Sequence, residues 1–563
     1  MMTPVVLLLA TACSVSAADT SPGLHSRQDC AALLDSLRSA AVERTGPLGL
    51  VPGGPDPGPP PALEVPAYDP STSDVDLPDQ VARSGPQVLF VSGRTLLVLR
   101  ARDGSVQRRL RLPKGYESAR VVTDGRRALL LADHDPDGAE PATPSARVLT
   151  VDLSAFRITG ELRMPGSLAD ARRAGPLVRV SVRALPRLEF PAPPPPRERA
   201  SPDFAPRARQ HNRDIVREAP AEAFHPSYDV TSGGETTRHK VPCQRINRPV
   251  GDRASSVLTV FTFDLSRPIG DASPVAIAGG PATVHGTAAH LFVAESDPAS
   301  VTTRVHRLDL TRPRPLYVGS GSVTGEILDG EAMSEHDGYL RLAVGDPDRT
   351  QGDLYILETD GPVLDPVGKL TDISGDNGIR SVTFLGARAY VTTTRAQGPL
   401  PALDLANPYK PRRDGDVAFP AASTRLLPSS DGRFLAVGQP RTGRGTPRGL
   451  RVSLFEPGPG KHVRLADFRR PGMPGARVED DPYAYWHDAA SGVTVLPTVP
   501  NGAVVLSVTR DAGIRQLGRI SHRPSSTGVY RALLVDDALW TFSSEGVMVH
   551  DARTLKRRAW TAL

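Results

Sequence analysis

The sequence predicts an all-β fold: a β-propeller of about eight four-stranded blades, with nine as the alternative count, preceded by a signal peptide and one short N-terminal helix. Composition is the first observation. The 563 residues include 51 Gly and 56 Pro, a supply of turn formers that suits many short strands. The second observation is a repeated unit of two strands joined by a tight turn and a third strand that ends in an acid-led turn. Such repeats, about 40 to 50 residues long, are typical of propeller blades.

The acid-led turns mark the repeat along the chain. They lie at Asp103, Asp152, Asp264, Asp309, Glu358, Asp404, Glu456, Asp511 and Asp551. The intervals between them are 40 to 55 residues, except for 112 residues between Asp152 and Asp264, where the chain contains an insertion. This pattern gives nine modules, and one divergent unit would reduce the closed ring to eight blades.

Residues 1–18 have the pattern of an export signal peptide. An apolar stretch from Pro4 to Ala12 precedes small residues and is too short to span a bilayer. Two processing sites compete. Residues 10–13, ATAC, resemble a bacterial lipobox and would leave a lipidated Cys13, whereas residues 15–17, VSA, form an ordinary small-x-small site that releases the chain. Both routes predict a protein that is secreted or attached to the outer face of the cell membrane, with a lipid on Cys13 as its membrane contact.

Residues 19–66 are expected to hold a helix and a proline-rich linker. Residues 26–29 resemble a capping box. The apolar residues after them follow helical spacing and predict an amphipathic helix over about 27–44; they are Cys30, Leu33, Leu34, Leu37 and Ala41. Residues 51–66 are too rich in proline for a helix or a central strand. The propeller then occupies 67–563, with a partly disordered, proline-rich insertion at about 187–253 in which 212–224 are expected to form a short helix.

The three cysteines predict one disulfide. Cys13 leaves with the signal or carries the lipid, so Cys30 and Cys243 remain in the mature chain. Two thiols of an exported protein meet an oxidising compartment, where they tend to pair. Two buried free thiols are the alternative.

Residues 334–338, SEHDG, contain every side-chain type of a hydrolase triad. Ser334, His336, Asp337 and Gly338 nevertheless occupy the position where other modules have a hairpin turn, such as Asp124-Gly125. Neighbouring strand residues also point to opposite faces, and a triad usually assembles from separated segments. The sequence therefore predicts a structural turn at this position.

Residues 133–138 begin like a calcium loop. Asp133, Asp135 and Asp137 alternate before Gly138, which is a cation-binding arrangement, but Pro144 stands where a bidentate Glu is expected. An acidic hairpin loop is the alternative to calcium. The sequence points to no other cofactor.

Charge and motifs narrow the functions. The net charge is +5 and the cations are almost all Arg, spread without a basic run, so a nucleic-acid partner is not expected. An aromatic cluster at 483–487, YAYWH, is explained by blade-core packing better than by sugar stacking. Because no catalytic motif is visible, a binding or scaffolding module with an extracytoplasmic protein or envelope polymer as partner is favoured over an enzyme. The alternative is a secreted or cell-surface hydrolase whose catalytic residues lie on loops of several blades.

Several segments together carry a family resemblance. They are DCAALLDSLRSAAVERTGPLGL, NRDIVREAPAEAF, VPCQRINRP, EAMSEHDGYLRLAV, GIRSVTFLGARAYVTT and LDLANPYKPR. They resemble the secreted bacterial beta-propeller family, which is distantly related to WD repeats and common in actinobacteria and some archaea. The resemblance implies an exported propeller and adds no chemistry. Where relatives carry VDEPDLVKTDG, this chain has VDLPDQVARSG at 75–85, which keeps Asp76, Pro78 and Asp79 but lacks the Glu, the Lys and the Asp-Gly turn.

Overall fold

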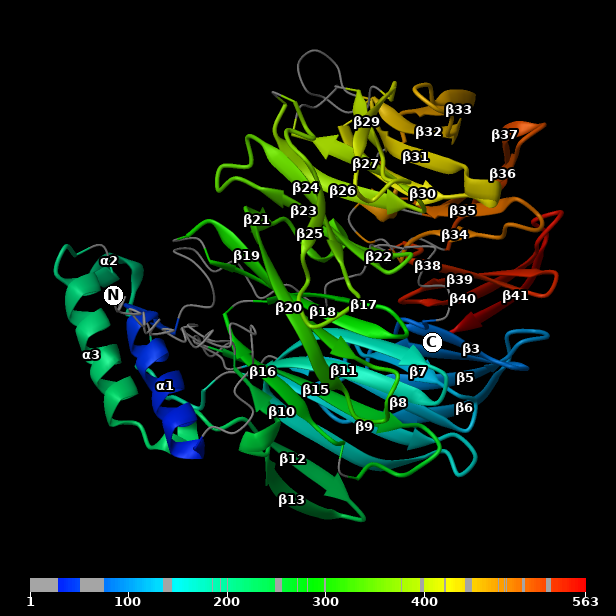
Figure 1. Cartoon of the computed structure of the whole chain (residues 1–563). Coiled ribbons are helices and arrows are strands. Elements are labelled where there is room, and N and C mark those ends of the chain that lie inside the picture. Colours follow the sequence, from blue (N-terminus) through cyan, green and yellow to red (C-terminus); the bar gives the residue numbers. More distant parts are fainter. Residues whose placement is uncertain are drawn as a thin grey trace, which may run out of the picture.

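The computed structural model describes residues 29–50 and 75–563, apart from gaps at 135–143, 185, 193, 200, 249–255, 271, 281, 298–299, 376, 395–398, 420–421, 441–447, 474, 480, 482, 499–501 and 523–527. These residues form nine antiparallel blades of four strand positions, arranged as a ring (Figure 1). The predicted all-β propeller is confirmed, and the blade count is the larger of the two alternatives. The predicted signal peptide with Cys13, residues 19–28 and the linker at 51–66 lie outside the described residues.

The blades follow the chain, and each begins with its innermost strand and ends with its outermost. Blade 1 comprises β3 Val81–Ser84, β4 Gln87–Ser92, β5 Thr95–Arg100 and β6 Val106–Arg111. Blade 2 comprises β7 Arg120–Thr123, β8 Arg127–His134, β9 Ser145–Asp152 and the first half of β10 Arg157–Ala174. Blade 3 comprises the second half of β10, β11 Leu177–Ala184, β15 Ser256–Asp264 and β16 Val275–Gly279. Blade 4 comprises β17 Ala282–Gly286, β18 His290–Asp297, β19 Thr302–Asp309 and β20 Leu316–Thr324. In blade 5, β21 Glu326–Ile327 and β22 Met333–His336 share the innermost position, followed by β23 Tyr339–Gly345, β24 Gly352–Glu358 and β25 Pro366–Leu370. Blade 6 comprises β26 Ile379–Leu385, β27 Arg388–Thr393, β28 Leu400–Asp404 and β29 Arg412–Val417. Blade 7 comprises β30 Ala422–Pro428, β31 Phe434–Gln439, β32 Gly449–Glu456 and β33 Val463–Pro471. Blade 8 comprises β34 Trp486–His487, β35 Val493–Pro497, β36 Ala503–Thr509 and β37 Gly513–Ile520. Blade 9 comprises β38 Arg531–Val535, β39 Ala538–Ser543, β40 Gly546–Asp551 and β41 Arg557–Ala562.

The core of the ring is divided among the joints between blades. In the described part of the chain, nine apolar clusters each draw buried side chains from two adjacent blades. One of them packs Val88 and Phe90 of blade 1 against Trp540 and Phe542 of blade 9. Neither of these two blades contains a strand from the other end of the chain. Side-chain packing therefore closes the ring.

The middle strands of each blade are buried on both faces, which explains their uninterrupted apolar runs. In β8 every residue from Ala128 to Ala132 is buried, without the alternation of a sheet that faces water on one side. The outermost strands are different. In β6 the residues Gln107 to Arg109 are exposed, because only one edge and part of each face are covered there.

Arginine side chains link successive blades through backbone carbonyls. Each extends from one blade and donates to a carbonyl oxygen of the next blade, most often in the turn after its third strand. The pairs are Arg108 with Leu153 and Ser154, Arg127 with Leu265, Arg179 with Leu310, Arg307 with Gly361, and Arg341 with Gly386. The planar fork of a guanidinium suits such contacts better than the single ammonium of a lysine.

The acid-led turns identified in the sequence follow the third strands of the nine blades of the described chain. In six of these turns the carboxylate accepts hydrogen bonds from residues two or three positions later; these are Asp103, Asp152, Asp264, Asp309, Asp404 and Asp551. Asp264, for example, accepts from the backbone N–H and the hydroxyl of Ser266 at 2.9 and 2.6 Å. Hydroxyl and backbone donors of this kind lower the pKa of Asp264 and Asp309 below the ordinary value of 3.8.

The insertion differs from the expected partly disordered segment, because most of its described residues have secondary structure. They form α2 Pro196–Arg199, α3 Phe204–Glu218, η2 Ala221–Ala223, β12 Ser227–Ser232, β13 Glu235–Lys240, η3 Cys243–Arg245 and β14 Ile246–Asn247. The hairpin of β12 and β13 extends blade 2 by pairing with β10. Backbone pairing and packing against a second helix compensate for the low hydrophobic content that suggested disorder.

The predicted N-terminal helix is α1 Cys30–Glu43, and it packs beside α3 at the edge of the ring (Figure 1). Asp29 caps it by accepting from the N–H of Ala31 at 3.2 Å, and its buried face holds Leu33, Leu34 and Leu37. Asn212 of α3 donates to the carbonyl of Gly46, in the short hairpin of β1 Thr45–Gly46 and β2 Gly49–Leu50. The helix pair is thus a single attachment on blades 2 and 3.

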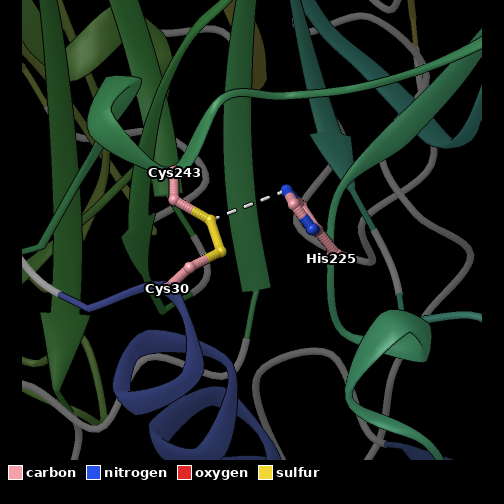
Figure 2. Close-up of side chains that lie close together, drawn as sticks. All are labelled: Cys30, His225 and Cys243. Carbon is pink, nitrogen blue, oxygen red and sulfur yellow. Dashed lines mark hydrogen bonds between the residues drawn. A yellow bond between two sulfur atoms is a disulfide. The ribbon is translucent and has the colours of Figure 1, made fainter.

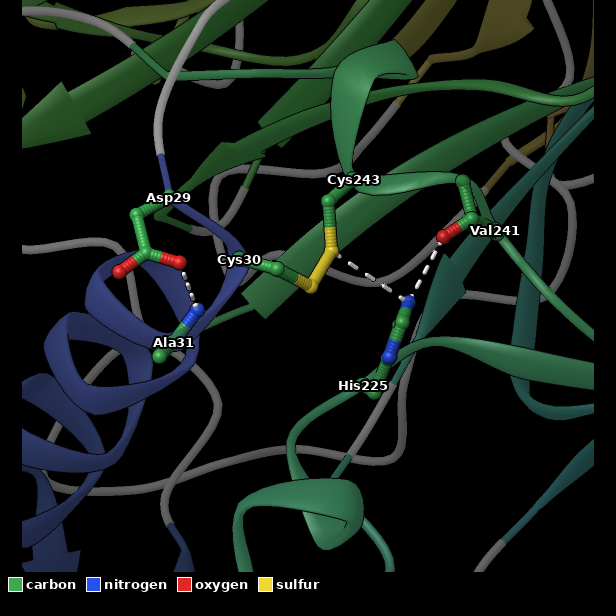
Figure 3. The surroundings of a disulfide bond; sticks show 6 residues. All are labelled: Asp29, Cys30, Ala31, His225, Val241 and Cys243. Carbon is green, nitrogen blue, oxygen red and sulfur yellow. Dashed lines mark hydrogen bonds between the residues drawn. A yellow bond between two sulfur atoms is a disulfide. The ribbon is translucent and has the colours of Figure 1, made fainter.

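The predicted disulfide joins this attachment to the end of the insertion. Cys30 begins α1 and Cys243 begins η3, and their Cα atoms are 5.6 Å apart (Figure 2). Figure 3 shows the cap of Asp29 next to the bond and Nε2 of His225 beside the sulfur of Cys243. The bond closes a sequence separation of 213 residues. The bond therefore holds α1 to the end of the insertion and limits how far the helix can move away from the ring.

We expect the double variant Asp264→Asn, Asp309→Asn to melt below the wild type near neutral pH, with a difference that shrinks as the pH falls to about 3. A lowered pKa means that each carboxylate stabilises the fold above the unfolded value of 3.8, and that this contribution is lost as the pH falls through the folded pKa. Thermal melts followed by circular dichroism measure the difference. The exposed Asp365→Asn is the control, and a difference independent of pH would contradict the assignment.

We expect the double variant Cys30→Ser, Cys243→Ser to open α1 more easily, by about 3 kcal/mol in the free energy of local opening. The reason is that the unfolded attachment gains the freedom of a long open loop. Hydrogen exchange of the α1 amides measures this free energy, and the amides of β39 and β40 are the internal control. Free thiols at both positions in a non-reducing peptide map of the wild type would contradict the prediction.

Candidate functional site

The SEHDG segment is placed in a hairpin between β22 and β23. Asp337 and Gly338 form its two-residue turn with φ of 49° and 80°. Ser334 is buried and accepts a hydrogen bond from Arg341, the side chain that reaches blade 6. Glu335 points toward blade 4 instead, where it accepts from Thr287 at 2.8 Å and lies 2.5 Å from Nδ1 of His290. His336 Nε2 lies 3.5 Å from a carboxylate oxygen of Asp337, whereas the hydroxyl of Ser334 is engaged by Arg341. The segment links blade 5 to both neighbours, and its serine does not join the other two residues in a triad.

A polar network gathers where the innermost strands surround the axis of the ring. We call it the axial network, and its members lie on or just before the innermost strands of blades 1, 2, 3, 8 and 9: Asp79, Arg120, Asp170, Arg172, Asp481, Tyr483 and Arg531. Both amino-terminal and carboxy-terminal blades contribute, so the network crosses the seam at which the ring closes.

Arg531 is the centre of this network. Its Nε lies 2.8 Å from both carboxylate oxygens of Asp79, and its Nη1 lies 2.6 Å from Asp481. The guanidinium also covers the ring of Tyr483, at 5.5 Å from the centroid, and Arg120 approaches the same ring at 5.3 Å. Burial opposes the charged guanidinium, but the two carboxylates outweigh it and raise the pKa of Arg531. Burial raises the pKa of Tyr483 to about 12, so its hydroxyl stays neutral.

Residues 75–85, where the chain departs from the resembling family, supply part of these contacts. Asp76 pairs with Arg173 of blade 3 through the backbone and through an ion pair at 2.5 Å. Asp79 pairs with Arg531 of blade 9. The two aspartates retained in this segment therefore connect the start of the first blade to its neighbour blade 9 and, past blade 2, to blade 3.

A second group of carboxyls lies at the inner end of blade 5. Asp329 caps the turn η4 Gly330–Ala332, and Glu331 meets Arg425 of blade 7 at 2.5 Å. Arg425 also donates to the carbonyl of Val478. Burial raises the pKa of both Asp329 and Glu331, and the repulsion from Asp329 adds to the shift at Glu331. Two neighbouring carboxyls with raised pKa values are a feature shared with many acid–base sites.

The predicted calcium loop is only partly described. Asp135 and Asp137 lie outside the described residues. Asp133 accepts a hydrogen bond from the backbone N–H of Leu168 at 2.8 Å, and burial raises its pKa to about 6. One oxygen of Asp133 thus joins blade 2 to blade 3, and calcium at this loop stays a prediction.

Cys30, His225 and Cys243 form one group with metal-ligand chemistry, since one donor atom of each lies within 4.8 Å of the others. The two sulfurs are joined to each other, however, and are not thiolates. Nε2 of His225 lies 2.7 Å from the carbonyl of Val241 and therefore donates its proton there (Figure 3). In this oxidised form the group stabilises the attachment.

Among the described helices, none is long and apolar enough to cross a membrane.

Sequence patterns single out two members of the axial network, Tyr483 through its aromatic cluster and Asp79 through the resemblance. Arg120 and Arg531 belong to no sequence motif, and each is the first residue of an otherwise largely apolar strand. The start of an innermost strand is the positional signal they share. This positional signal can be used only after each strand has been assigned to its place in a blade, because nothing in the local sequence distinguishes these arginines from those on the outer strands.

We expect Arg531→Ala to lower the free energy of unfolding by about 3 kcal/mol, because it leaves two carboxylates without their cation near the axis. Adding Asp79→Asn and Asp481→Asn in the same chain should recover part of the loss. Calorimetry measures the effect, with the exposed Arg470→Ala as the control. Equal melting of Arg531→Ala and the control would contradict the central position of Arg531.

Comparison with known proteins agrees with this architecture. The model of the Beta propeller domain family matches residues 70–555. An uncharacterized protein of Methanocaldococcus jannaschii is 32% identical over 239 residues, which cover 42% of this chain and 36% of the relative. An uncharacterized protein of Archaeoglobus fulgidus is 26% identical over 247 residues, with the same two shares. The chain thus aligns with about a third of the length of these archaeal relatives.

Solved structures resemble this chain only distantly. A protein from Lactobacillus plantarum has a TM-score of 0.33 and 10% identity, covering 54% of this chain and 90% of its own. Saccharomyces cerevisiae Sqt1 has a TM-score of 0.27 and 8% identity, covering 50% and 84%. The family match extends over nearly all the residues from which the nine blades are built, so this chain belongs to the Beta propeller domain family.

Proposed function

We propose that the protein is an extracytoplasmic binding or scaffolding module that holds an envelope component on the outside of its ring. The observation that supports this most directly is the axial network, whose carboxylates and guanidinium groups are engaged with each other. A catalytic site at the axis would need polar groups that are free to contact a substrate. The outer surfaces of the blades are then the surfaces open to a partner.

The location rests on the export signal in residues 1–18 and on the disulfide, which suits an oxidising compartment. Membership of the secreted bacterial group related to WD repeats, lipidation of Cys13 and calcium near Asp133 are parts of the same proposal. None of them is required for the binding function itself.

Large apolar side chains offer little to a protein partner. Within the described ranges the exposed ones are scattered singly and are Leu48, Leu316, Tyr409, Val463 and Leu563. Protein interfaces usually contain a contiguous apolar centre. A polar or charged partner, such as an envelope polymer, fits this surface better.

The alternative function, a hydrolase of envelope or extracellular polymers, is favoured by one observation. Asp329 and Glu331 are two carboxyls with raised pKa values near the axis. A carboxyl with a raised pKa keeps its proton to a higher pH and is therefore better suited to serve as a general acid. Arg425 and the capped turn nevertheless occupy both groups, which favours a structural role.

The deciding experiment is a cross-linked pull-down of the tagged protein from intact producing cells, followed by a panel of envelope polymers. A stoichiometric partner released intact would support the binding function. Hydrolysis of a polymer that Glu331→Gln abolishes, without lowering the melting temperature, would instead establish the enzyme. The conservative variant Asp365→Asn on the outer surface serves as the matched control for the panel.

A further inference from the structure

The outermost strands of four consecutive blades carry a concentration of arginine. β33, β37, β41 and β6 belong to blades 7, 8, 9 and 1, and they follow one another along the right-hand edge of the ring in Figure 1. These four strands are described throughout and contain ten arginines and a single acidic residue, Asp467. All ten side chains are exposed: Arg108, Arg109, Arg111, Arg464, Arg469, Arg470, Arg515, Arg519, Arg557 and Arg558. We call this surface the arginine crescent.

Most of the crescent is not neutralised by the protein itself. Arg469 pairs with Asp467, Arg558 pairs with Asp537 and Asp551, and Arg108 donates to carbonyls of blade 2. The other seven have no carboxylate within ion-pair distance among the described residues. They are Arg109, Arg111, Arg464, Arg470, Arg515, Arg519 and Arg557. Each of the four blades contributes at least one.

The outer strands of blades 3 to 6 show that this is not a general property of the rim. β16 and β20 contain no charged residue, and β25 contains only Lys369, which pairs with Asp353 at 3.0 Å. In β29 the arginines Arg412 and Arg413 are matched by Asp404 and Asp416. On the outer strands of blade 2, which adjoins blade 1, Arg163 and Arg238 are paired, whereas Arg157 and Lys240 are exposed without a carboxylate in ion-pair distance among the described residues. The unpaired cations of the outer strands are therefore concentrated on blades 7, 8, 9 and 1, with two more on the adjoining blade 2, where they create a field of one sign.

Shape and composition indicate what this surface fits. Four of nine blades span close to half of the circumference, so a flat membrane could touch only a small part of the crescent. A flexible chain could follow the curve and meet every blade. Guanidinium groups bind carboxylates and phosphates through two parallel hydrogen bonds, which suits a polymer with repeated anionic groups.

Nucleic acid is less well suited to the crescent than an acidic glycan. Single strands are usually held by exposed aromatic side chains on which the bases stack. The aromatic residues of the four strands, Phe468 and Trp560, are half-buried and pack against the apolar clusters at the joints of blade 8. The crescent thus supplies charge without stacking surfaces.

We propose that the arginine crescent binds a linear acidic polysaccharide, whose carboxylate groups pair with arginines of blades 7, 8, 9 and 1. This inference rests on the proposed binding function and names its partner class. The polymer lies along the rim, and the ring serves as the rigid support on which the arginines are spaced. The pairing is electrostatic, so it weakens as salt is added.

The test uses the full-length protein and labelled polygalacturonate, followed by fluorescence anisotropy at several salt concentrations. The crescent variant combines Arg111→Gln, Arg464→Gln, Arg515→Gln and Arg557→Gln, one substitution in each blade. The control variant combines Arg207→Gln, Arg209→Gln, Arg314→Gln and Arg380→Gln, which removes four exposed arginines from other parts of the surface. Thermal melts check that both variants remain folded.

We expect the crescent variant to bind at least about tenfold more weakly than the wild type at low salt, and the slope of log Kd against log salt to fall by about three. The control variant should bind as the wild type does. Equal binding by the two variants would overturn the crescent as the site, and a single-stranded DNA of matched charge that binds more tightly than polygalacturonate would overturn the glycan. If a pull-down recovers a partner and both variants still bind it, the proposed binding function would be supported and the crescent would be excluded as its site.

Discussion

The fold depends on the burial of apolar faces between adjacent blades. No blade could be stable alone, because both faces of its middle strands are apolar and only a neighbour on each side removes them from water. A fully buried aliphatic or aromatic side chain contributes about 1.5 to 3 kcal/mol, and each joint contains several. The joint of blades 9 and 1 is the critical one, since Phe90, Trp540 and Phe542 must meet there although the chain does not run directly from one of these blades into the other. Every other feature of the molecule is arranged around this closed ring.

Polar groups add specificity to the apolar joints. A buried or half-buried arginine costs desolvation, so its presence between two blades is a poor source of stability but a strong determinant of register. Arg341 connects the turn of its own blade to Gly386, and Arg179 does the same for the carbonyl of Leu310. The axial network repeats this on a larger scale, because Arg531 joins three segments that are far apart in the chain. The richness in arginine therefore has a structural use beyond its effect on net charge.

The same residue type has two roles according to where its strand lies. On inner and middle strands, guanidinium groups such as those of Arg127, Arg179, Arg341 and Arg531 bind carbonyls and carboxylates of neighbouring blades. On the outer strands of blades 7, 8, 9 and 1 they remain exposed and mostly unpaired. This separation leaves the axis filled and the rim charged. The proposed polymer-binding function uses the part of the ring that folding does not need.

Local sequence determined the fold class, the repeat and the turns, because each of these depends on neighbours along the chain. Short apolar runs, Asp-Gly pairs and acid-led turns act within a few residues, and they located the helix of α1 and the hairpin at Asp337-Gly338. The pairing of Cys30 with Cys243 followed from there being two cysteines left to pair. The order of the insertion could not be predicted, since β12 gains its partners from β10 of another blade. Tertiary structure alone decided the axial network and the arginine crescent, because both bring together residues from blades at opposite ends of the chain, and only ring closure makes those blades neighbours.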